Sequence, residues 1–239
     1  RVPLRLEDGF QLDPDAVRQA ITPRTRALLI NSPMNPTGVV FRPEILRELT
    51  ALGIPVISDE IYADLTYGNR PQSLLEFTEE AIALNGFSKY YAMTGWRLGY
   101  LIAPESWMPG IVKMHQNLMI STTHFVQDAG VRVLDEGGPE CERMKAEFDQ
   151  RRQFLLEKLQ AIGLGPGYDP TGAFYVFLKY RTPKKSLELA LEILEQTGVA
   201  LSPGVDFGQG GEGFLRFSYA NSAENLGIAV DRLAESGLL

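Results

Sequence analysis

Short apolar runs alternate with amphipathic segments along the first part of the chain. Each run is rich in Leu, Ile or Val and ends in polar or turn-forming residues, which is typical of strands buried in a parallel sheet. We expect strands at residues 27–31, 54–58, 82–85 and 98–103, with helices between them. One such helix is expected at residues 42–52, with Gly53 as its stop. The pattern predicts an α/β fold, a mainly parallel sheet with helices on both faces.

The pattern changes near residue 145, where a long helix with one apolar stripe is expected at residues 139–162. The elements expected after it are a strand within 172–180, a helix at 186–197 that stops at Gly198, a strand around Val199, a strand at 214–219 and a last helix at 223–235. These elements make an α+β arrangement. The sequence therefore predicts two domains, residues 1–145 and residues 146–239.

Composition and charge argue against several classes of protein. A net charge of −7 without a basic cluster does not suit nucleic-acid binding. No apolar run approaches the length of a membrane span, and no leader resembles a signal peptide. The single cysteine, Cys141, excludes an intrachain disulfide and fits a reducing compartment, so a cytoplasmic location is expected. His115 and His124 lack the companions of a metal site, and no metal is expected.

One lysine lies where a charged residue is unusual. Lys89 follows the expected strand at 82–85, in the stretch NGFSKYYAMTGWRLGY, and Arg97 lies eight residues further on. An ammonium that leaves water must find a partner or give up its proton, and a desolvated lysine amine can act as a nucleophile. For an isolated pair of this kind, a surface lysine with its stem on apolar surface is the commoner interpretation.

Polar residues also follow two other expected strands. Asn35 lies in the turn sequence NPTG after the first strand, and Asp59 and Tyr62 follow the second. Open parallel sheets place their ligand sites at such strand ends. Taken singly, NPTG is a turn sequence, and Asp59 or Glu60 is equally well explained as an acid at a helix N-terminus.

A fourth segment, GFLRFSYANS, has Arg216 inside an alternating strand pattern. A guanidinium suits a carboxylate because it donates two parallel charge-assisted hydrogen bonds. The alternative is an exposed arginine on a strand.

Together the four segments resemble the class I/II aminotransferases, which are pyridoxal 5'-phosphate enzymes of fold type I. AMTGWRLGY after Lys89 matches the family's cofactor-lysine signature almost letter for letter, and the other motifs follow in the family's order. The resemblance implies fold type I, with a truncated, mainly parallel sheet. It also implies that residues 1–145 are the remainder of the large cofactor-binding domain and residues 146–239 the C-terminal small domain.

The resemblance implies a role for each matched residue. Lys89 would hold pyridoxal phosphate as a Schiff base and serve as the base that moves the substrate's Cα proton, and Arg97 would bind the cofactor's phosphate. Asp59 would pair with the protonated pyridine nitrogen, which keeps the ring an electron sink. Tyr62 would hydrogen-bond the phenolic oxygen. Asn35 would contact the same oxygen and lie near the substrate carboxylate.

Two further assignments complete the expected site. Arg216 would clamp the α-carboxylate of the substrate. Many relatives carry a serine three residues before the lysine, where this chain has Gly86, so Ser88 is the nearest hydroxyl for a phosphate contact.

The implied function is transfer of an amino group between an α-amino acid and a 2-oxo acid, by a homodimer. Two alternatives stay open: a pyridoxal-phosphate lyase of the same fold, and a non-catalytic fragment that only associates with another chain. The preferred amino acid is not predicted. The stretch QNLMISTTHF at residues 116–125 either faces the site or packs as a helix.

The match starts well inside the family's usual length, with RVPLRLEDGFQLDPDAV. We therefore expect the family's amino-terminal part, including its phosphate-binding loop and the aromatic ring that stacks on the cofactor, to be missing from this chain. Absence of its strands would leave unpaired sheet edges that favour association.

Overall fold

The computed structural model describes residues 1–68 and 70–239, which form two compact units. Unit 1 comprises residues 1–2, 12–33 and 40–145, and unit 2 comprises residues 3–11, 34–39 and 146–239. Two short segments near the amino terminus therefore belong to the same unit as the carboxyl-terminal residues. The assignment of residues 1–145 to a large domain and 146–239 to a small one stays a prediction.

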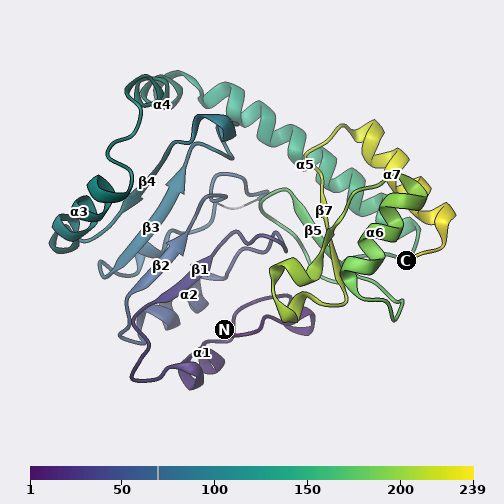
Figure 1. The fold of residues 1–239 in the computed structure, drawn as a ribbon, viewed down its shortest axis with the longest axis horizontal. Helices are drawn as coiled ribbons and strands as arrows, with labels where there is room; N and C mark the ends of the chain where they lie inside the picture. The colour runs from purple at the N-terminus through teal and green to yellow at the C-terminus, as the bar shows by residue number, and fades with distance from the viewer. Residues whose placement is uncertain (69) are drawn as a thin grey trace. The chain divides into compact units, whose positions relative to one another are not determined.

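Unit 1 is built on a four-stranded sheet in the order β1-β2-β3-β4 (Figure 1). Its strands are β1 (Leu28–Asn31), β2 (Val56–Asp59), β3 (Ala81–Gly86) and β4 (Gly99–Ile102). The first three are parallel, and β4 pairs antiparallel with β3. The predicted mainly parallel sheet is confirmed, and each strand begins and ends within two residues of its predicted range.

The helices of unit 1 are α1 (Pro14–Ala20), α2 (Pro43–Thr50), α3 (Met108–Leu118) and α4 (His124–Glu136). Helix α2 has its proline in the first turn and buries Ile45, Leu46 and Leu49. It ends at Thr50, two residues before the predicted end. The Ala51 N–H caps this end of the helix by donating to the carbonyl oxygens of Arg47 and Leu49.

Unit 2 contains a three-stranded antiparallel sheet in the order β5-β7-β6. Its strands are β5 (Tyr175–Lys179), β6 (Ser202–Pro203) and β7 (Phe214–Ser218), and its helices are α6 (Ser186–Thr197) and α7 (Ala223–Ser236). The long helix α5 (Gly138–Ala161) begins in unit 1 and continues into unit 2 (Figure 1).

Helix α6 agrees with its predicted range, because Gly198 adopts a φ of +71° and ends it. The strand expected around Val199 is wrong in position. The run from Val199 to Leu201 is apolar, but only Ser202 and Pro203 pair with β7. Strand β6 therefore begins three residues later than predicted.

An aromatic core holds the amino-terminal segments of unit 2 on its sheet. Phe10 and Val39 are buried against Phe177 of β5 and Phe214 of β7. The rings of Phe177 and Phe214 stack at 4.8 Å, and Phe10 meets Phe214 edge-on at 5.7 Å. Burial of these side chains is favourable enough to fix both segments in place.

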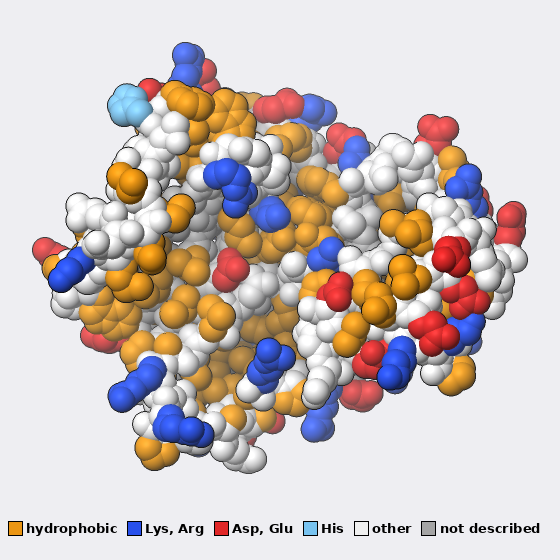
Figure 2. All heavy atoms as spheres, viewed as in Figure 1, with side chains coloured by type: hydrophobic (Ala, Val, Ile, Leu, Met, Phe, Trp, Pro, Cys, Tyr) orange, Lys and Arg blue, Asp and Glu red, His pale blue; other side chains and the backbone are white. Residues whose placement is uncertain are grey.

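Both edge strands of unit 1 carry exposed apolar side chains. Leu29 on β1 is 74% exposed, and Tyr100 and Ile102 on β4 are 46% and 52% exposed. Helices α3 and α4 add exposed Met114, Leu118, Phe125, Val131 and Leu134. Figure 2 shows hydrophobic side chains on the surface where Figure 1 has these two helices. Exposed apolar patches and sheet edges are suited to association.

Two kinds of site are not found in the part of the chain that the structure describes. Over residues 1–68 and 70–239, no helix is both long and apolar enough to cross a bilayer. Within the same residues, no three His, Cys, Asp or Glu side chains gather as a metal site would require. Cys141 is buried in α5, and burial raises the pKa of its thiol.

Candidate functional site

The residues predicted for the site fall into two groups, one in each unit. Unit 1 contains Asp59, Tyr62, Ser88, Lys89 and Arg97, and unit 2 contains Asn35 and Arg216. Their roles stay predictions, but the structure gives the local geometry of each group.

Asp59 is the last residue of β2, at the carboxyl end of the parallel strands. Its carbonyl oxygen accepts hydrogen bonds from Ser32 N at 3.1 Å and Asn31 Nδ2 at 3.0 Å. Its side-chain Oδ1 accepts a 3.2 Å hydrogen bond from Ile61 N, two residues later. The carboxylate therefore closes the turn after the strand, which fixes the direction in which it points.

Glu60, the neighbouring acid, has a structural contact. It is buried, and its Oε1 accepts a 3.0 Å hydrogen bond from Leu74 N, the first residue of a short 3₁₀ helix at Leu74–Glu76. Glu60 thus binds the amino terminus of a 3₁₀ helix fourteen residues later in the chain, whereas Asp59 holds the turn directly after β2.

Lys89 lies beside Tyr62. Its Nζ is 5.6 Å from the centroid of the Tyr62 ring, a cation–π distance, and Tyr62 is only 3% exposed. Tyr62 comes three residues after β2 ends, and Lys89 comes three residues after β3 ends. Because β2 and β3 are adjacent and parallel, with Asp59 opposite Leu84, both residues follow the same edge of the sheet.

Gly86 has a steric explanation. It pairs with Gly99 across β3 and β4, and a Cβ added to Gly86 would lie 3.0 Å from both Gly99 Cα and Leu98 O. The close approach of these strands favours glycine at the position where many relatives carry serine. Ser88 is half-buried and directly precedes Lys89.

Arg97 is exposed and lies at the end of a short 3₁₀ helix, Thr94–Trp96. Its φ is +56°, in the left-handed region that few residues other than glycine adopt. Its Nη1 donates a 2.8 Å hydrogen bond to Thr94 O. The next residue, Leu98, accepts a 3.1 Å hydrogen bond from Phe87 N. Arg97 therefore lies close in space to the chain that leads from β3 to Lys89.

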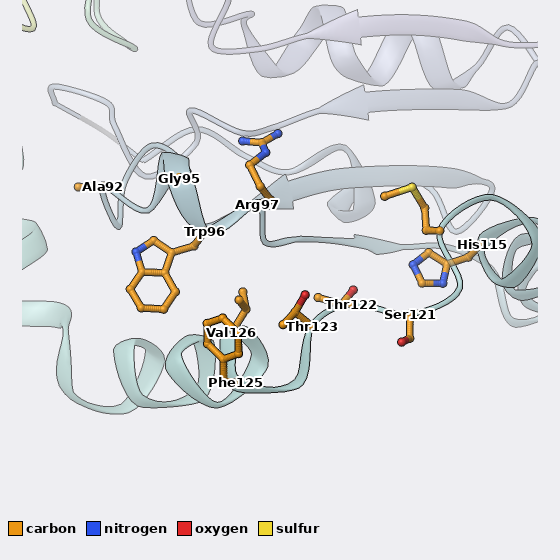
Figure 3. A pocket seen from close by; sticks show the side chains of 11 residues that line it. Ala92, Gly95, Trp96, Arg97, His115, Ser121, Thr122, Thr123, Phe125 and Val126 are labelled. Carbon is orange, nitrogen blue, oxygen red and sulfur yellow. The ribbon is translucent and has the colours of Figure 1, made fainter.

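A cavity of about 670 Å³ opens beside Arg97 in unit 1. Figure 3 shows Trp96 facing Phe125 and Val126 across it. The Arg97 side chain points away from these three side chains. The stretch at 116–125 contributes to its wall with Met119, Ser121, Thr122, Thr123 and Phe125. This stretch therefore lines a cavity that also contains Arg97.

In unit 2, Arg216 contacts Asn35 directly. Arg216 is in the middle of β7, and its Nη1 donates a 2.8 Å hydrogen bond to Asn35 Oδ1. The two residues come from motifs that the sequence placed far apart, and the fold brings them together.

The loop at 34–39 that carries Asn35 is tied to the β5 strand. The hydroxyl of Tyr168 donates a 2.8 Å hydrogen bond to Thr37 O and accepts a 2.9 Å hydrogen bond from Phe177 N of β5. Burial raises the pKa of Tyr168, so the phenol stays protonated and able to donate. The peptide bonds before Pro33 and Pro36 are cis.

Gly38 is the loop position at which glycine is required. Its φ is +71°, and a Cβ there would lie 2.7 Å from Gly172 O and 2.9 Å from Tyr175 O. Both distances are far below van der Waals contact. The glycine of the NPTG turn therefore allows the loop to lie against β5.

Three residues around Arg216 were missed by the sequence analysis. Its Nη2 donates a 3.0 Å hydrogen bond to Ser202 Oγ, and its Cζ lies 4.3 Å from the Tyr175 ring centroid and 4.9 Å from that of Phe207. The register of β5, β6 and β7 would have indicated Ser202 and Tyr175, but a single sequence does not specify that register.

Comparison with known proteins identifies the family. The profile described as "Aminotransferase class I and II" matches residues 1–233. The (5-formylfuran-3-yl)methyl phosphate transaminase of Methanocaldococcus jannaschii is 40% identical over 226 residues, which cover 92% of this chain and 60% of that protein. Aromatic-amino-acid aminotransferase 2 of Thermococcus litoralis is 37% identical, over 97% of this chain and 62% of its own length.

A solved structure of a Thermus thermophilus aspartate aminotransferase mutant superposes on this chain with a TM-score of 0.93 and 38% identity. The match covers 100% of this chain and 66% of that structure. The chain spans 60% and 62% of the length of the two curated relatives above. At these levels of identity and coverage, the chain belongs to the class I and II aminotransferase family and has the α/β fold of the type I pyridoxal-phosphate enzymes.

Proposed function

We propose that the protein to which this chain belongs is a pyridoxal-phosphate aminotransferase that moves an amino group between an α-amino acid and a 2-oxo acid. The observation that carries the proposal is the grouping of Asp59, Tyr62 and Lys89 at the carboxyl ends of β2 and β3, in a chain of the aminotransferase family. The similar proteins described above are a transaminase and an aminotransferase, which supports the proposal.

The side chains of unit 1 fit the cofactor chemically. A carboxylate, a phenol and an amine follow adjacent parallel strands, where open α/β sheets bind ligands. In the proposal, Lys89 holds pyridoxal phosphate through a Schiff base, Asp59 pairs with its ring nitrogen, and Tyr62 hydrogen-bonds its phenolic oxygen. Arg97 and Ser88 bind its phosphate. When bound, the cofactor supplies an electron sink for the pair left at the substrate's Cα.

In the proposal, the residues of unit 1 move a proton at Lys89 and hold a negative charge at Asp59. The Lys89 amine would accept the substrate's Cα proton at Nζ as a general base and then, as a general acid, donate it to the cofactor's C4′ carbon. The Tyr62 ring beside Nζ stabilises the protonated amine through its π face. The Asp59 carboxylate keeps its direction because the Ile61 N–H holds Oδ1.

The residues of unit 2 bind the substrate's α-carboxylate. The Arg216 guanidinium donates two parallel charge-assisted hydrogen bonds to it. Asn35 orients Arg216 through Nη1 and also contacts the carboxylate and the cofactor's phenolic oxygen. Holding the carboxylate fixes the direction of the Cα–H bond relative to the base. The rate of proton removal then increases through orientation alone.

We also propose that the protein works as a homodimer in the cytoplasm, in amino-acid metabolism. The exposed apolar side chains of β4, α3 and α4 support an association surface. Light scattering coupled to size-exclusion chromatography tests this. A dimeric mass is expected at micromolar concentration, and a monomeric mass would contradict the proposal.

Product analysis tests the reaction. The gene-encoded protein, loaded with pyridoxal phosphate, is mixed with an amino acid and no 2-oxo acid. Transamination yields one keto acid and one pyridoxamine phosphate per site. Ammonia and pyruvate from a β-substituted substrate would instead indicate a lyase, and absence of any product would favour a non-catalytic chain.

A further inference from the structure

Arg216 and Ser202 lie directly opposite each other on the antiparallel strands β7 and β6. Side chains at opposed positions of an antiparallel pair face the same side of the sheet. From that position the Ser202 hydroxyl oxygen accepts a 3.0 Å hydrogen bond from Arg216 Nη2. The contact is therefore a consequence of strand register.

Two aromatic rings hold the same guanidinium. Arg216 Cζ is 4.3 Å from the Tyr175 centroid and 4.9 Å from the Phe207 centroid, both within cation–π range. Phe207 in turn packs edge-on against Phe177 at 5.8 Å, and Phe177 is part of the buried core of unit 2. The Phe207 ring is thus held by the core, and the two rings together restrain the plane of the guanidinium.

The hydrogen bonds restrain the in-plane direction of the guanidinium. Nη1 donates to Asn35 and Nη2 donates to Ser202, so both terminal nitrogens are held by side chains from different segments. Each terminal nitrogen carries two hydrogens, so one hydrogen bond at each leaves a second N–H at each for a ligand. A carboxylate needs two coplanar N–H groups, and a group that is already oriented loses less entropy when it binds.

We propose that Ser202 is a positioning residue that, together with the rings of Tyr175 and Phe207, holds Arg216 in the orientation that binds the substrate's α-carboxylate. This inference rests on the proposed function, because it concerns the same carboxylate. Ser202 acts through Arg216 and takes no part in the chemical step. Its loss therefore weakens substrate binding and leaves the turnover of bound substrate nearly unchanged.

Steady-state kinetics of the gene-encoded holoenzyme test the proposal with Ser202→Ala, Ser202→Thr and the control Ser236→Ala, which removes a hydroxyl of α7 in the same unit. The amino donor is whichever of L-aspartate, L-alanine and L-phenylalanine reacts fastest with the wild type. Ser202→Ala is expected to raise KM about tenfold, the effect of losing one hydrogen bond to a charged group, and to change kcat less than threefold. Ser202→Thr restores KM to within threefold of wild type. An unchanged KM in Ser202→Ala, or an equal loss in Ser236→Ala, overturns the proposal.

Nuclear magnetic resonance of the arginine side chains provides a readout that does not need turnover. Held terminal nitrogens rotate slowly about the Nε–Cζ bond, so Arg216 is expected to give separate Nη1 and Nη2 signals that merge in Ser202→Ala and remain separate in Ser202→Thr. The Arg216→Lys spectrum assigns the signals. Merged signals in the wild type overturn the positioning role, whereas absence of transamination with separate wild-type signals counts against the proposed function alone.

Discussion

Asn35 accepts a 2.8 Å hydrogen bond at Oδ1 from Nη1 of Arg216, a residue 181 positions later in the chain. Both side chains lie in unit 2, because the loop at 34–39 packs against β5 and the aromatic core. The NPTG turn and the arginine strand therefore form one structural group. A change in the loop is therefore expected to reach Arg216.

Gly38→Ala should destabilise the loop at 34–39 and thereby displace Asn35 from its contact with Arg216. The new Cβ would meet Gly172 O at 2.7 Å in addition to a left-handed φ. We expect a loss of about 3 kcal/mol in the free energy of unfolding, from backbone strain and overpacking together. Urea denaturation of the gene-encoded protein measures it.

Gly9→Ala is the matched control, since Gly9 is also in unit 2 and has a φ of +62° but nothing within 4 Å of its Cβ position. Its cost should be about 1 kcal/mol, from the backbone alone. Equal losses in the two variants would show that the contact of the loop with β5 is unimportant.

Arg216→Ala should weaken substrate binding far more than cofactor binding. Removal of a bidentate charged partner is expected to raise KM about 100-fold or more, because each hydrogen bond to a charged group contributes about 1.5–3 kcal/mol. Arg216→Lys should recover little of this, since an ammonium does not reproduce the planar fork. Full recovery by lysine would mean that only the positive charge matters at this position.

Asp59→Asn and Glu60→Gln distinguish the roles of the two neighbouring acids in catalysis. Each substitution keeps an acceptor oxygen for its main-chain partner, Ile61 N or Leu74 N, so the fold should persist in both. If Asp59 has its proposed role, loss of its charge should lower kcat about 100-fold, because the cofactor's ring nitrogen would lose its counter-ion. Glu60→Gln should stay within threefold of wild type. Equal kcat losses in the two variants would contradict the assignment of Asp59.

Glu212 should make stability depend on pH in the acid range. Its carboxylate accepts hydrogen bonds from Ser186 N at the start of α6 and from the Tyr180 hydroxyl, and these contacts lower its pKa below the ordinary 4.5. A lowered pKa in the folded state means that the stabilisation is present above pH 4.5 and is lost as the pH falls through the folded value.

Glu212→Gln is therefore expected to flatten the decline of the melting temperature below pH 4.5. The control is Glu140→Gln, because Glu140 also has a lowered pKa but its hydrogen-bond partner, Arg143, is exposed. Exposed pairs contribute little to stability. Parallel pH profiles for wild type and Glu212→Gln would refute the prediction.

Much of unit 1 could be predicted from local pattern. Each of its strands combines an apolar run with polar residues at its end, so the positions of Asp59 and Lys89 at strand ends followed from the sequence. In unit 2, both ends of helix α6 were predicted correctly, and Gly198 is the stop signal at its carboxyl end. These features depend on neighbours in sequence, which a single chain displays.

The features that were missed depend on contacts between distant segments. The place of Asn35 in unit 2 follows from packing of Val39 and Tyr168, which no periodicity reveals. Strand β6 was predicted around Val199, but its position is set by pairing with β7. The contacts of Ser202 with Arg216 required the same register.

Identifying the lysine that carries the cofactor tests the role proposed for Lys89 most directly. The gene-encoded protein is saturated with pyridoxal phosphate, its Schiff base is reduced with borohydride to a stable bond, and the labelled peptide is identified by mass spectrometry. The label is expected on Lys89 and should be absent in Lys89→Ala. A label on another lysine, such as Lys113 or Lys145, with Lys89 unmodified would contradict it.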